Sequence, residues 1–196
     1  MKKIVVASGN KGKLREIAEI FSGFAVVSMQ EAGFAGDIEE NGATFEENAL
    51  IKARAVCRAL GSPALADDSG LCVRALGGAP GVHSARYAGI HGDDAANNAL
   101  LLKNLAGVPA PERDAYFESC VALCFPDGRE VTAAGRTYGH ILTEAEGKNG
   151  FGYDPLFYSD ELQKSFGIAT SEEKNAVSHR AKALAALVKK CEGLLL

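Results

Sequence analysis

The spacing of hydrophobic positions changes several times along the N-terminal part of the chain. A short β-branched run at 4–7 is closed by polar residues at 8–10, and apolar side chains then recur at helical spacing over 14–21. This order predicts a strand, a polar loop and a helix. The run at 25–28 predicts a second short strand, and an acidic loop is expected at 37–42.

A capping box predicts where the next helix begins. Thr44 is followed three residues later by Glu47, a spacing at which each side chain can bond the backbone N–H of the other residue. Apolar residues continue at helical spacing as far as Gly61, a residue type that commonly ends helices. We therefore expect a helix between Thr44 and Gly61.

The middle of the chain combines a strand with a glycine-rich loop. Apolar residues at 63–66 predict a buried strand that ends at Asp67 and Asp68, and the stretch 77–81 holds too much glycine and proline for a helix. We expect the two aspartates to lie in a loop at the strand end, where functional groups often gather.

A change to strict alternation predicts a long hairpin. Apolar residues alternate over 117–125, Asp127-Gly128 supplies a turn, and the pattern returns over 131–138. Before this hairpin, Asp93 or Asp94 is placed to cap a further helix.

The C-terminal part predicts a rigid loop at 150–155, a short strand at 156–158 and one final helix. A second capping box, Thr170 with Glu173, precedes that helix. Its apolar face is expected to comprise Ala183, Leu184, Leu187, Val188 and Cys191. Alternating strands and helices with one long hairpin predict an α/β fold around a mixed β-sheet.

The composition is that of an ordinary globular protein with one domain. The chain has 196 residues, 47% of them hydrophobic, which suffices to bury a core without disulfides. Its net charge of −4 argues against an RNA-binding or other nucleic-acid-binding module, which needs a basic excess. Any phosphate chemistry must therefore use a local cluster of cations.

Cysteine usage and hydropathy predict a cytoplasmic protein. The five cysteines are scattered and form no C-x-x-C pair, which favours free thiols in a reducing compartment over a zinc site. The N-terminus turns polar at once, without the apolar region of a signal peptide, and no apolar run approaches the length of a membrane span. We expect no membrane partner.

The segment Ser8-Gly9-Asn10-Lys11-Gly12-Lys13 joins the first predicted strand to the first helix. Backbone N–H groups and the helix dipole at such a place favour anions, and two lysines add positive charge. The glycine spacing is too short for a Walker A loop, and Leu14 follows the lysine where Ser or Thr is required. The segment is a candidate phosphate-binding loop, and a solvated helix start is the alternative.

Carboxylates gather in the acidic loop and at the end of the strand that follows. Adjacent residues of an extended segment point to opposite faces, so only one of Asp67 and Asp68 is expected to face a given cleft. One carboxylate from each loop suffices to hold Mg²⁺, which prefers oxygen ligands and bridges substrate phosphates. Asp37, Glu39 or Glu40 can supply the carboxylate of the acidic loop. Lys52, on the capped helix, is a further candidate.

Two groups near the C-terminus are suited to binding a phosphate or a purine base. Lys174 lies one helical turn before Ser178, and His179 and Arg180 add hydrogen-bond donors. In the loop Phe151-Gly152-Tyr153-Asp154, a ring can stack on a base and the carboxylate can fix its orientation. A solvent-exposed helix turn and core aromatics are the alternatives.

Together these segments resemble the inosine triphosphate pyrophosphatase family over almost the whole chain. That family removes non-canonical purine nucleotides such as ITP, dITP and XTP from the nucleotide pool. Each motif is weak alone, but their occurrence in register argues against coincidence. The motifs are Ser8-Gly9-Asn10 with Lys13, Thr44-Phe45 with Asn48-Ala49 and Lys52-Ala53, Asp67-Asp68-Ser69-Gly70-Leu71, Leu76-Gly77-Gly78-Ala79-Pro80-Gly81 with Ser84-Ala85-Arg86-Tyr87, Gly150-Phe151-Gly152-Tyr153-Asp154-Pro155, and Glu173-Lys174 with Ser178-His179-Arg180.

The resemblance implies a division of roles among these residues. Glu40 and Asp68 would position Mg²⁺, and Asp68 would also be the base that activates water. Lys13, Lys52 and Arg86 would neutralise the negative charge of the phosphates, with Lys13 and Lys52 taking part in catalysis. The other contacts to the substrate would come from Ser8, Gly9, Asn10, Lys11, Gly12, Ser69, Phe151, Gly152, Tyr153, Asp154, Lys174, His179 and Arg180.

The resemblance also implies the fold and the reaction. The fold would be an elongated mixed sheet flanked by helices in two lobes with a central substrate cleft, forming a single bilobal nucleotide pyrophosphatase domain over 1–196 and usually a homodimer. The reaction would be Mg²⁺-dependent cleavage of a nucleoside triphosphate between the α and β phosphates, releasing the monophosphate and pyrophosphate.

Selectivity for hypoxanthine and xanthine is expected from hydrogen-bond donors beside the 6-oxo group, such as His179 or Arg180. Adenine has a 6-amino donor there and would leave a buried donor unpaired, at a cost of about 1–3 kcal/mol. The main alternative is a septum-inhibition type pyrophosphatase that acts on dTTP or UTP. A nucleotide sensor without turnover is a second alternative, and the pair Glu40 and Asp68 argues against it.

Overall fold

Seven strands form a mixed sheet in the computed structural model, which describes residues 2–21 and 23–191. Their order is β2-β1-β3-β4-β5-β6-β7, with β1 parallel to both β2 and β3, and β6 antiparallel to both β5 and β7. The strands are β1 (Lys2–Val6), β2 (Phe24–Ser28), β3 (Ala64–Val73), β4 (Asp114–Cys124), β5 (Glu130–Ile141), β6 (Phe157–Ser159) and β7 (Lys164–Ser165). The predicted α/β class with a mixed sheet is confirmed.

Helices fill most of the intervals between these strands. The α-helices are α1 (Lys11–Ile20), α2 (Phe45–Leu60), α3 (Asp94–Asn104), α4 (Ser171–Val177) and α5 (His179–Lys190). Short 3-10 helices are η1 (Arg74–Leu76), η2 (Gly81–Arg86), η3 (Ala110–Glu112) and η4 (Asp154–Leu156). In the described part of the chain, no helix has the length and apolar character needed to cross a bilayer.

The chain divides into two compact units. Unit 1 comprises the described residues of Met1–Asp68, Ser119–Gly135 and Arg180–Leu196, and unit 2 comprises Ser69–Glu118 and Arg136–His179. The strands β3, β4 and β5 each contribute residues to both units. The substrate cleft that the family resemblance implies stays a prediction.

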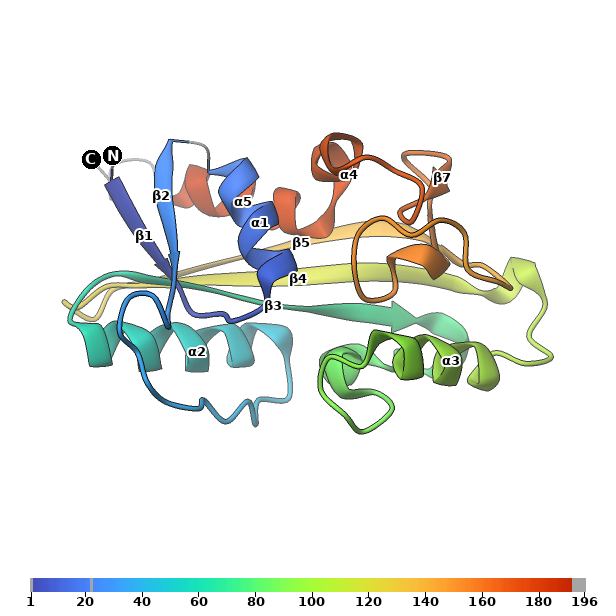
Figure 1. The fold of residues 1–196 in the computed structure, drawn as a ribbon, viewed down its shortest axis with the longest axis horizontal. Helices are drawn as coiled ribbons and strands as arrows, with labels where there is room; N and C mark the ends of the chain where they lie inside the picture. The colour runs from blue at the N-terminus through green and yellow to red at the C-terminus, as the bar shows by residue number, and fades with distance from the viewer. Residues whose placement is uncertain (1, 22, 192–196) are drawn as a thin grey trace. The chain divides into compact units, whose positions relative to one another are not determined.

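Unit 1 has a hydrophobic core on each face of its strands. Because strand side chains alternate between faces, Leu65 packs with apolar residues of α1 and α5, whereas Ala64 and Ala66 pack with those of α2. Figure 1 shows α2 on one face of these strands and α1 and α5 on the other. The same alternation sends Asp67 to the α1 and α5 face and Asp68 to the α2 face.

Local signals predicted the helices of unit 1 well. Thr44 and Glu47 form the expected capping box at the start of α2, and Gly61 ends that helix in the left-handed conformation. The hairpin is also confirmed, because β4 and β5 are neighbours and Phe125 closes the turn by bonding Arg129.

The third strand is longer than its sequence pattern predicts. We expected it to end at Asp67 and Asp68, but β3 continues to Val73. Its second half supplies Leu71 and Val73 to the core of unit 2, and that burial keeps the chain extended beyond the two charged residues. Both aspartates therefore lie in the middle of a strand and not in a loop.

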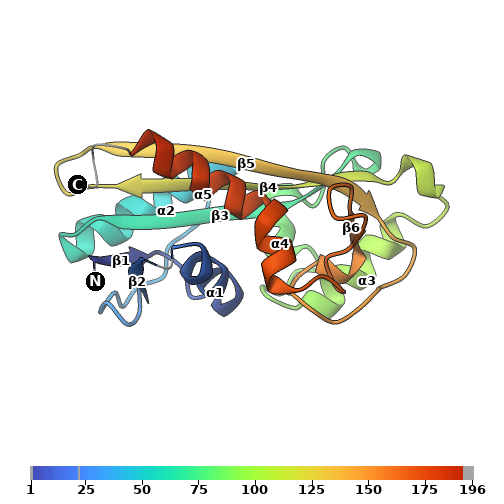
Figure 2. The ribbon, with the colours of Figure 1, turned by 90° about the horizontal axis from the view of Figure 1, so that it is seen from above.

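Unit 2 is built around aromatic residues. The ring of Phe117, on β4, lies 4.8 Å from the ring of Phe157 and 6.3 Å from that of Phe166, measured between centroids. Leu101 and Leu105 belong to the same core and place α3 against these rings. The course of α3 and of α4 within this unit can be followed in Figure 2.

The expected single C-terminal helix is two helices. The capping box of Thr170 and Glu173 starts α4, which ends at Ser178 because that residue is extended, with φ −67° and ψ 152°. A new helix, α5, then buries Ala183, Leu184, Leu187 and Cys191 as expected. Val188 is 41% exposed, contrary to our expectation, because it follows Leu187 by one residue and so lies about 100° around the helix.

All five cysteines are buried, and no disulfide joins them among the described residues. Burial raises the pKa of the thiols of Cys57, Cys72, Cys124 and Cys191, which keeps them protonated near neutral pH. These thiols behave as small core side chains.

Candidate active site

The loop before α1 is held by its own side chains. Asn10 caps the helix, its side chain accepting the backbone N–H of Lys13 at 3.1 Å. The backbone N–H of Asn10 in turn donates to the hydroxyl of Ser8 at 3.1 Å. A Cβ on Gly9 would lie 3.0 Å from Nε2 of Gln30, an exposed side chain that can shift, so packing does not require glycine here. The exposed Lys11 and the cap leave the N-terminus of α1 directed at solvent, as an anion site requires.

The side chain of Lys13 faces the strand β3 and not solvent. Its ammonium lies 2.8 Å from Oδ2 of Asp67 and 3.4 Å from the carbonyl oxygen of the same residue. The side chain of Lys13 is 15% exposed and that of Asp67 is fully buried. The contact joins residues that are 54 positions apart in the sequence.

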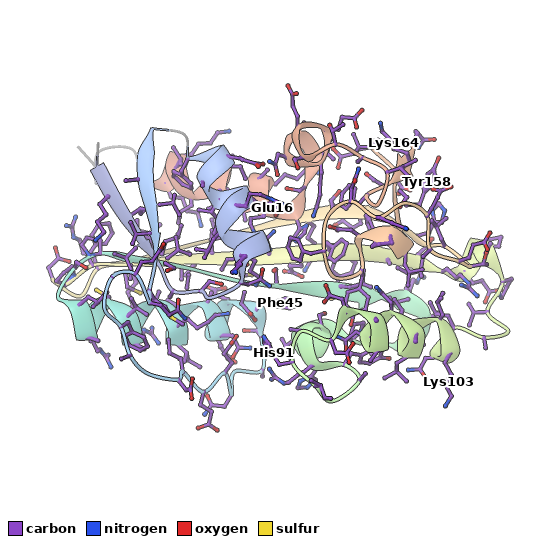
Figure 3. All side chains as sticks on the ribbon, viewed as in Figure 1. Glu16, Phe45, His91, Lys103, Tyr158 and Lys164 are labelled. Carbon is purple, nitrogen blue, oxygen red and sulfur yellow. The ribbon has the colours of Figure 1, made fainter. Side chains whose placement is uncertain are left out.

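Asp67 is the centre of a buried charged group on the α1 and α5 face. Its carboxylate accepts a hydrogen bond from Ser119 at 2.5 Å and lies 3.3 Å from a guanidinium nitrogen of Arg180. Arg180 also pairs with Glu16, which projects from α1 (Figure 3). Burial acts to raise the pKa of Asp67, but Arg180 and Lys13 outweigh it and hold that pKa well below its usual range. Asp67 is therefore ionised in the folded state near neutral pH.

On the opposite face of β3, Lys52 joins two other carboxylates. Its ammonium lies 2.7 Å from Oε2 of Glu40 and 2.9 Å from Oδ1 of Asp68. The side chains of Lys52 and Asp68 are each 11% exposed, and that of Glu40 is 25% exposed. We call Glu40, Lys52 and Asp68 the Lys52 cluster.

The pKa values of the two carboxylates of the Lys52 cluster are shifted in opposite directions. Burial raises the pKa of Asp68 above its ordinary value, and Lys52 only partly offsets this effect. Burial acts in the same direction on Glu40, but the charge and hydrogen bond of Lys52, together with Lys13 and Asp68, outweigh it and lower the pKa of Glu40. The two anions outweigh the effect of burial on Lys52, whose pKa is raised. The cluster thus contains a fixed cation, a fixed anion and a carboxylate that accepts a proton more readily than usual.

The acidic loop that carries Glu40 is anchored to the start of α2. The backbone N–H of Gly42 donates to Oδ1 of the buried Asn48 at 2.8 Å, and that of Ala43 donates to Glu47 at 2.6 Å. A Cβ on Gly42 would lie 2.7 Å from Oδ1 of Asn48, so glycine is required for this approach. The anchor directs Glu40 toward Lys52.

The donor set of the Lys52 cluster fits a magnesium ion. Oδ2 of Asp68 is buried and accepts no hydrogen bond from any residue that the structure describes. A buried carboxylate oxygen without a donor is costly, and a hard cation that takes oxygen ligands relieves that cost. Among the described residues no three His, Cys, Asp or Glu side chains gather as a metal site, so a cation held by Glu40 and Asp68 would take its other ligands from water or a bound substrate.

In unit 2, Lys174 is buried and not solvent-exposed as a basic helix turn would be. Its ammonium lies 2.6 Å from Oδ2 of Asp154 and 4.7 Å from the centre of the Phe151 ring. The same carboxylate oxygen accepts the backbone N–H of Phe151 at 2.8 Å. A Cβ on Gly150 would lie 2.0 Å from this oxygen, so only glycine fits beside it. We call Phe151, Asp154 and Lys174 the Lys174 cluster.

Gly152 and Tyr153, in the same loop as Phe151, make structural contacts. The hydroxyl of Tyr153 donates to the carbonyl oxygen of Ser84 at 2.8 Å, and this residue is only 4% exposed. Burial raises the pKa of Tyr153, so its hydroxyl stays protonated. Gly152 is bonded through its backbone to α3.

The other residues that the sequence predicted for the site are not members of the Lys52 cluster or the Lys174 cluster as defined above. The imidazole ring of His179 stacks on Phe117, with centroids 4.9 Å apart, and is 4% exposed. Arg180 belongs to unit 1, where its guanidinium pairs with Glu16 and Asp67. Ser69 is half-buried on β3. Arg86 is half-buried at the end of η2.

Sequence reasoning missed the residues that hold the candidates in place. Glu16 and Ser119 complete the buried group around Asp67, and Asp94 and Asn98 hold Gly152. The position of Glu16 three residues after Lys13 was the available signal, since this spacing puts both on one side of α1.

Comparisons with known proteins identify the family. The family model described as Ham1 family matches residues 4–190. A dITP/XTP pyrophosphatase of Geobacter sulfurreducens is 51% identical over 189 residues, covering 95% of both chains, and one of Bacillus subtilis is 45% identical, covering 98% of both.

Solved structures agree with this match. The Ham1 protein of Staphylococcus aureus superimposes with a TM-score of 0.86 at 41% identity, covering 98% of this chain and 99% of the other. A HAM1 protein of Coxiella burnetii gives a TM-score of 0.87 at the same identity, covering 98% of this chain and all of the other. The resemblance drawn from the motifs is confirmed, and the chain belongs to the Ham1 family.

Proposed function

We propose that this protein hydrolyses the non-canonical purine nucleoside triphosphates ITP, dITP and XTP to the nucleoside monophosphate and pyrophosphate, and so cleanses the nucleotide pool. The names of relatives about half identical over nearly their whole length support this reaction. The observation that carries it is the Lys52 cluster, in which Asp68 combines a raised pKa with a buried oxygen that lacks a donor.

Asp68 is suited to act as the general base. A carboxylate whose pKa lies above its ordinary value removes a proton from water more readily than an exposed aspartate does. Lys52 touches the other oxygen of Asp68 and so fixes the direction in which the free oxygen points. Its positive charge also offsets negative charge that develops on a phosphate.

Mg²⁺ is the proposed cofactor, with Glu40 and Asp68 as its protein ligands. A bound Mg²⁺ supplies charge neutralisation at phosphate oxygens and lowers the pKa of a coordinated water. Glu40 is preferred over Glu39 because Glu40 pairs with Lys52, whereas Glu39 is exposed. Lys13, the loop Ser8–Gly12 and Arg86 are the proposed phosphate contacts, and Ser69 is a further proposed contact.

The Lys174 cluster is the proposed group for the base. Phe151 offers a ring face for stacking, and the Lys174 ammonium is a donor that cannot accept. Such a donor favours the 6-oxo group of hypoxanthine and xanthine over the 6-amino group of adenine. We assign recognition of the 6-oxo group to Lys174 because its ammonium lies 4.7 Å from the centre of the Phe151 ring, whereas the guanidinium of Arg180 pairs with Glu16 and Asp67. Gly152, Tyr153 and His179 support the cluster through contacts of their own.

The direct test is pyrophosphate release from ITP, XTP, GTP, ATP and dTTP in the presence of Mg²⁺. The wild type is expected to prefer ITP and XTP, and Asp68→Asn to lose that activity. A preference for dTTP would instead favour the septum-inhibition type of pyrophosphatase. Binding of ITP without release of pyrophosphate would favour the nucleotide sensor.

Three further properties are proposed with this function. The chain acts as a single bilobal domain over 1–196, works as a homodimer, and resides in the cytoplasm. Sedimentation equilibrium of the purified protein tests the dimer, and a mass equal to one chain at all concentrations would exclude it.

A further inference from the structure

The backbone of Gly152 is held on both sides by α3. Its N–H donates to Oδ2 of Asp94 at 2.8 Å, and its carbonyl oxygen accepts a hydrogen bond from Nδ2 of Asn98 at 2.9 Å. Asp94 and Asn98 are four residues apart, which places them on one face of the helix. Gly152 has a φ of +62°, a left-handed conformation that glycine adopts without steric cost. We call Asp94 and Asn98 the α3 clamp.

The clamp acts on the residue between the two aromatic side chains of the loop. Phe151 precedes Gly152 and contributes its ring to the Lys174 cluster, and Tyr153 follows it and bonds Ser84. By holding the backbone of Gly152, the clamp restricts the backbone positions open to Phe151, whose ring lies beside Lys174. The two hydrogen bonds of the clamp both go to the backbone of Gly152, which is not a member of the Lys174 cluster.

The hydrogen bond from Asn98 to Gly152 has a cost to folding. The carbonyl oxygen of Gly152 requires a donor, so the amide nitrogen of Asn98 must face it. This orientation leaves Oδ1 of Asn98 buried with no hydrogen-bond partner among the described residues. A buried polar atom without a partner is unfavourable. The hydrogen bond from Asn98 to Gly152, which holds the loop in position, offsets this cost.

We propose that Asp94 and Asn98 are positioning residues for base recognition, holding the 151–154 loop so that the Phe151 ring and the Asp154–Lys174 pair meet a purine in one geometry. The inference rests on the proposed function for the identity of the base. The clamp itself rests only on contacts within unit 2. Loss of the clamp raises the entropy that the loop must give up on binding, and this effect appears in KM and not in kcat.

Steady-state kinetics with ITP give the first readout. Asn98→Ala is expected to raise KM about fivefold and to leave kcat within about twofold, since the lost hydrogen bond does not touch the phosphates. Asn98→Asp keeps the shape but cannot donate to Gly152, so its KM is expected to rise at least as much. Asn104→Ala is the matched control, because it removes the same side chain from the same helix and breaks only a 2.8 Å bond to the hydroxyl of Tyr87.

A fluorescent reporter gives a second readout that needs no substrate. The chain contains no tryptophan, so Phe151→Trp introduces a single indole at the loop. Adding Asn98→Ala to this reporter is expected to increase the acrylamide quenching constant about twofold, because the indole gains mobility. Adding Asn104→Ala is expected to leave the constant unchanged.

The two readouts decide the inference together. An increase in both KM and quenching for Asn98→Ala, with neither for Asn104→Ala, supports the clamp as a positioning device. A change in only one of them, or in neither, overturns it. If the wild type hydrolyses none of the triphosphates, the proposed function fails. The reporter tests the clamp separately: if Asn98→Ala leaves the quenching constant of the Phe151→Trp protein unchanged, the clamp does not order the loop.

Discussion

The ammonium of Lys174 lies 2.6 Å from Oδ2 of Asp154 although the two side chains are only 5% and 3% exposed. Removing both charges from water is costly, and their attraction offsets that cost only while the pair is intact. The carboxylate also accepts the backbone N–H of Phe151, so the pair orders the loop beside it. Neither charge can be removed alone without leaving the other buried and uncompensated.

Asp154→Asn is therefore expected to reduce the free energy of unfolding by about 3–5 kcal/mol. Urea denaturation monitored by circular dichroism measures this loss. The control is Glu130→Gln, which breaks an equally short pair with Arg54 at the surface and is expected to cost about 0–1 kcal/mol. Similar losses for the two variants would show that burial does not set the strength of the Lys174 pair.

Asp67 and Asp68 are adjacent but are expected to respond in opposite ways to replacement by asparagine. Asp67→Asn leaves Arg180 and Lys13 without their shared anion, so we expect a loss of about 3–5 kcal/mol in the free energy of unfolding. Asp68→Asn removes a carboxylate that burial disfavours, so stability is expected to be retained while kcat falls about 10²–10⁴-fold.

Pyrophosphate release and urea denaturation, measured on the same preparations, separate these effects. Asp114→Asn, at an exposed aspartate whose pairing with Arg74 is long at 3.7 Å, is the control and should change neither quantity. Full activity in a folded Asp68→Asn variant would exclude Asp68 as the base.

Local signals explain which parts of this structure the sequence predicts. The capping box at Thr44 and Glu47 and the glycine at 61 act within a few residues, and α2 has the expected bounds. The second half of β3 depends on burial of Leu71 in the core of unit 2, which no local pattern shows. The residue types of the site were predictable, but their partners were not.

Long-range pairing is the reason that partners escape prediction. Lys13 meets Asp67 across 54 positions and Arg180 meets Asp67 across 113. A lysine on a helix is usually solvated, and nothing near Lys174 in the sequence indicates that its side chain is buried and paired with Asp154. Alternation along the strand did predict that Asp67 and Asp68 point to opposite faces, because that rule is local.

Stability is expected to depend on pH through Asp67. Burial opposes its ionisation, but Arg180 and Lys13 hold its pKa in the folded protein well below the unfolded value of about 3.9. The unfolded chain therefore binds a proton first as the pH falls. The stabilisation by Asp67 is present above the unfolded pKa and is lost as the pH falls through the folded pKa.

The measurement is the difference in unfolding free energy between wild type and Asp67→Asn at several pH values. This difference should be constant between about pH 5 and pH 7 and shrink below about pH 4. Asp68 contributes a pH dependence of stability with the opposite sign. Its pKa is raised in the folded protein, so its ionisation above the unfolded pKa destabilises the fold. A difference for Asp67→Asn that grows on acidification would contradict the assigned direction.

Glu40→Gln is expected to weaken Mg²⁺ binding without destroying the Lys52 cluster. Glutamine keeps an oxygen that Lys52 can reach, but the charge that attracts the cation is lost. The Mg²⁺ concentration for half-maximal pyrophosphate release should rise about tenfold, and kcat at saturating Mg²⁺ should recover in large part. Excess EDTA should abolish the activity of wild type and variant alike.

Glu39→Gln is the matched control, since it makes the same change one residue earlier in the same loop. Glu39 is exposed, whereas Glu40 lies 2.7 Å from the ammonium of Lys52, so only the second carboxylate is directed at Asp68. The Mg²⁺ requirement of Glu39→Gln should therefore match that of the wild type. If the two variants exchange behaviour, Glu39 is the ligand and the acidic loop must change its register when the metal binds. Equal shifts in both would mean that the loop attracts Mg²⁺ through its summed charge, without a defined ligand.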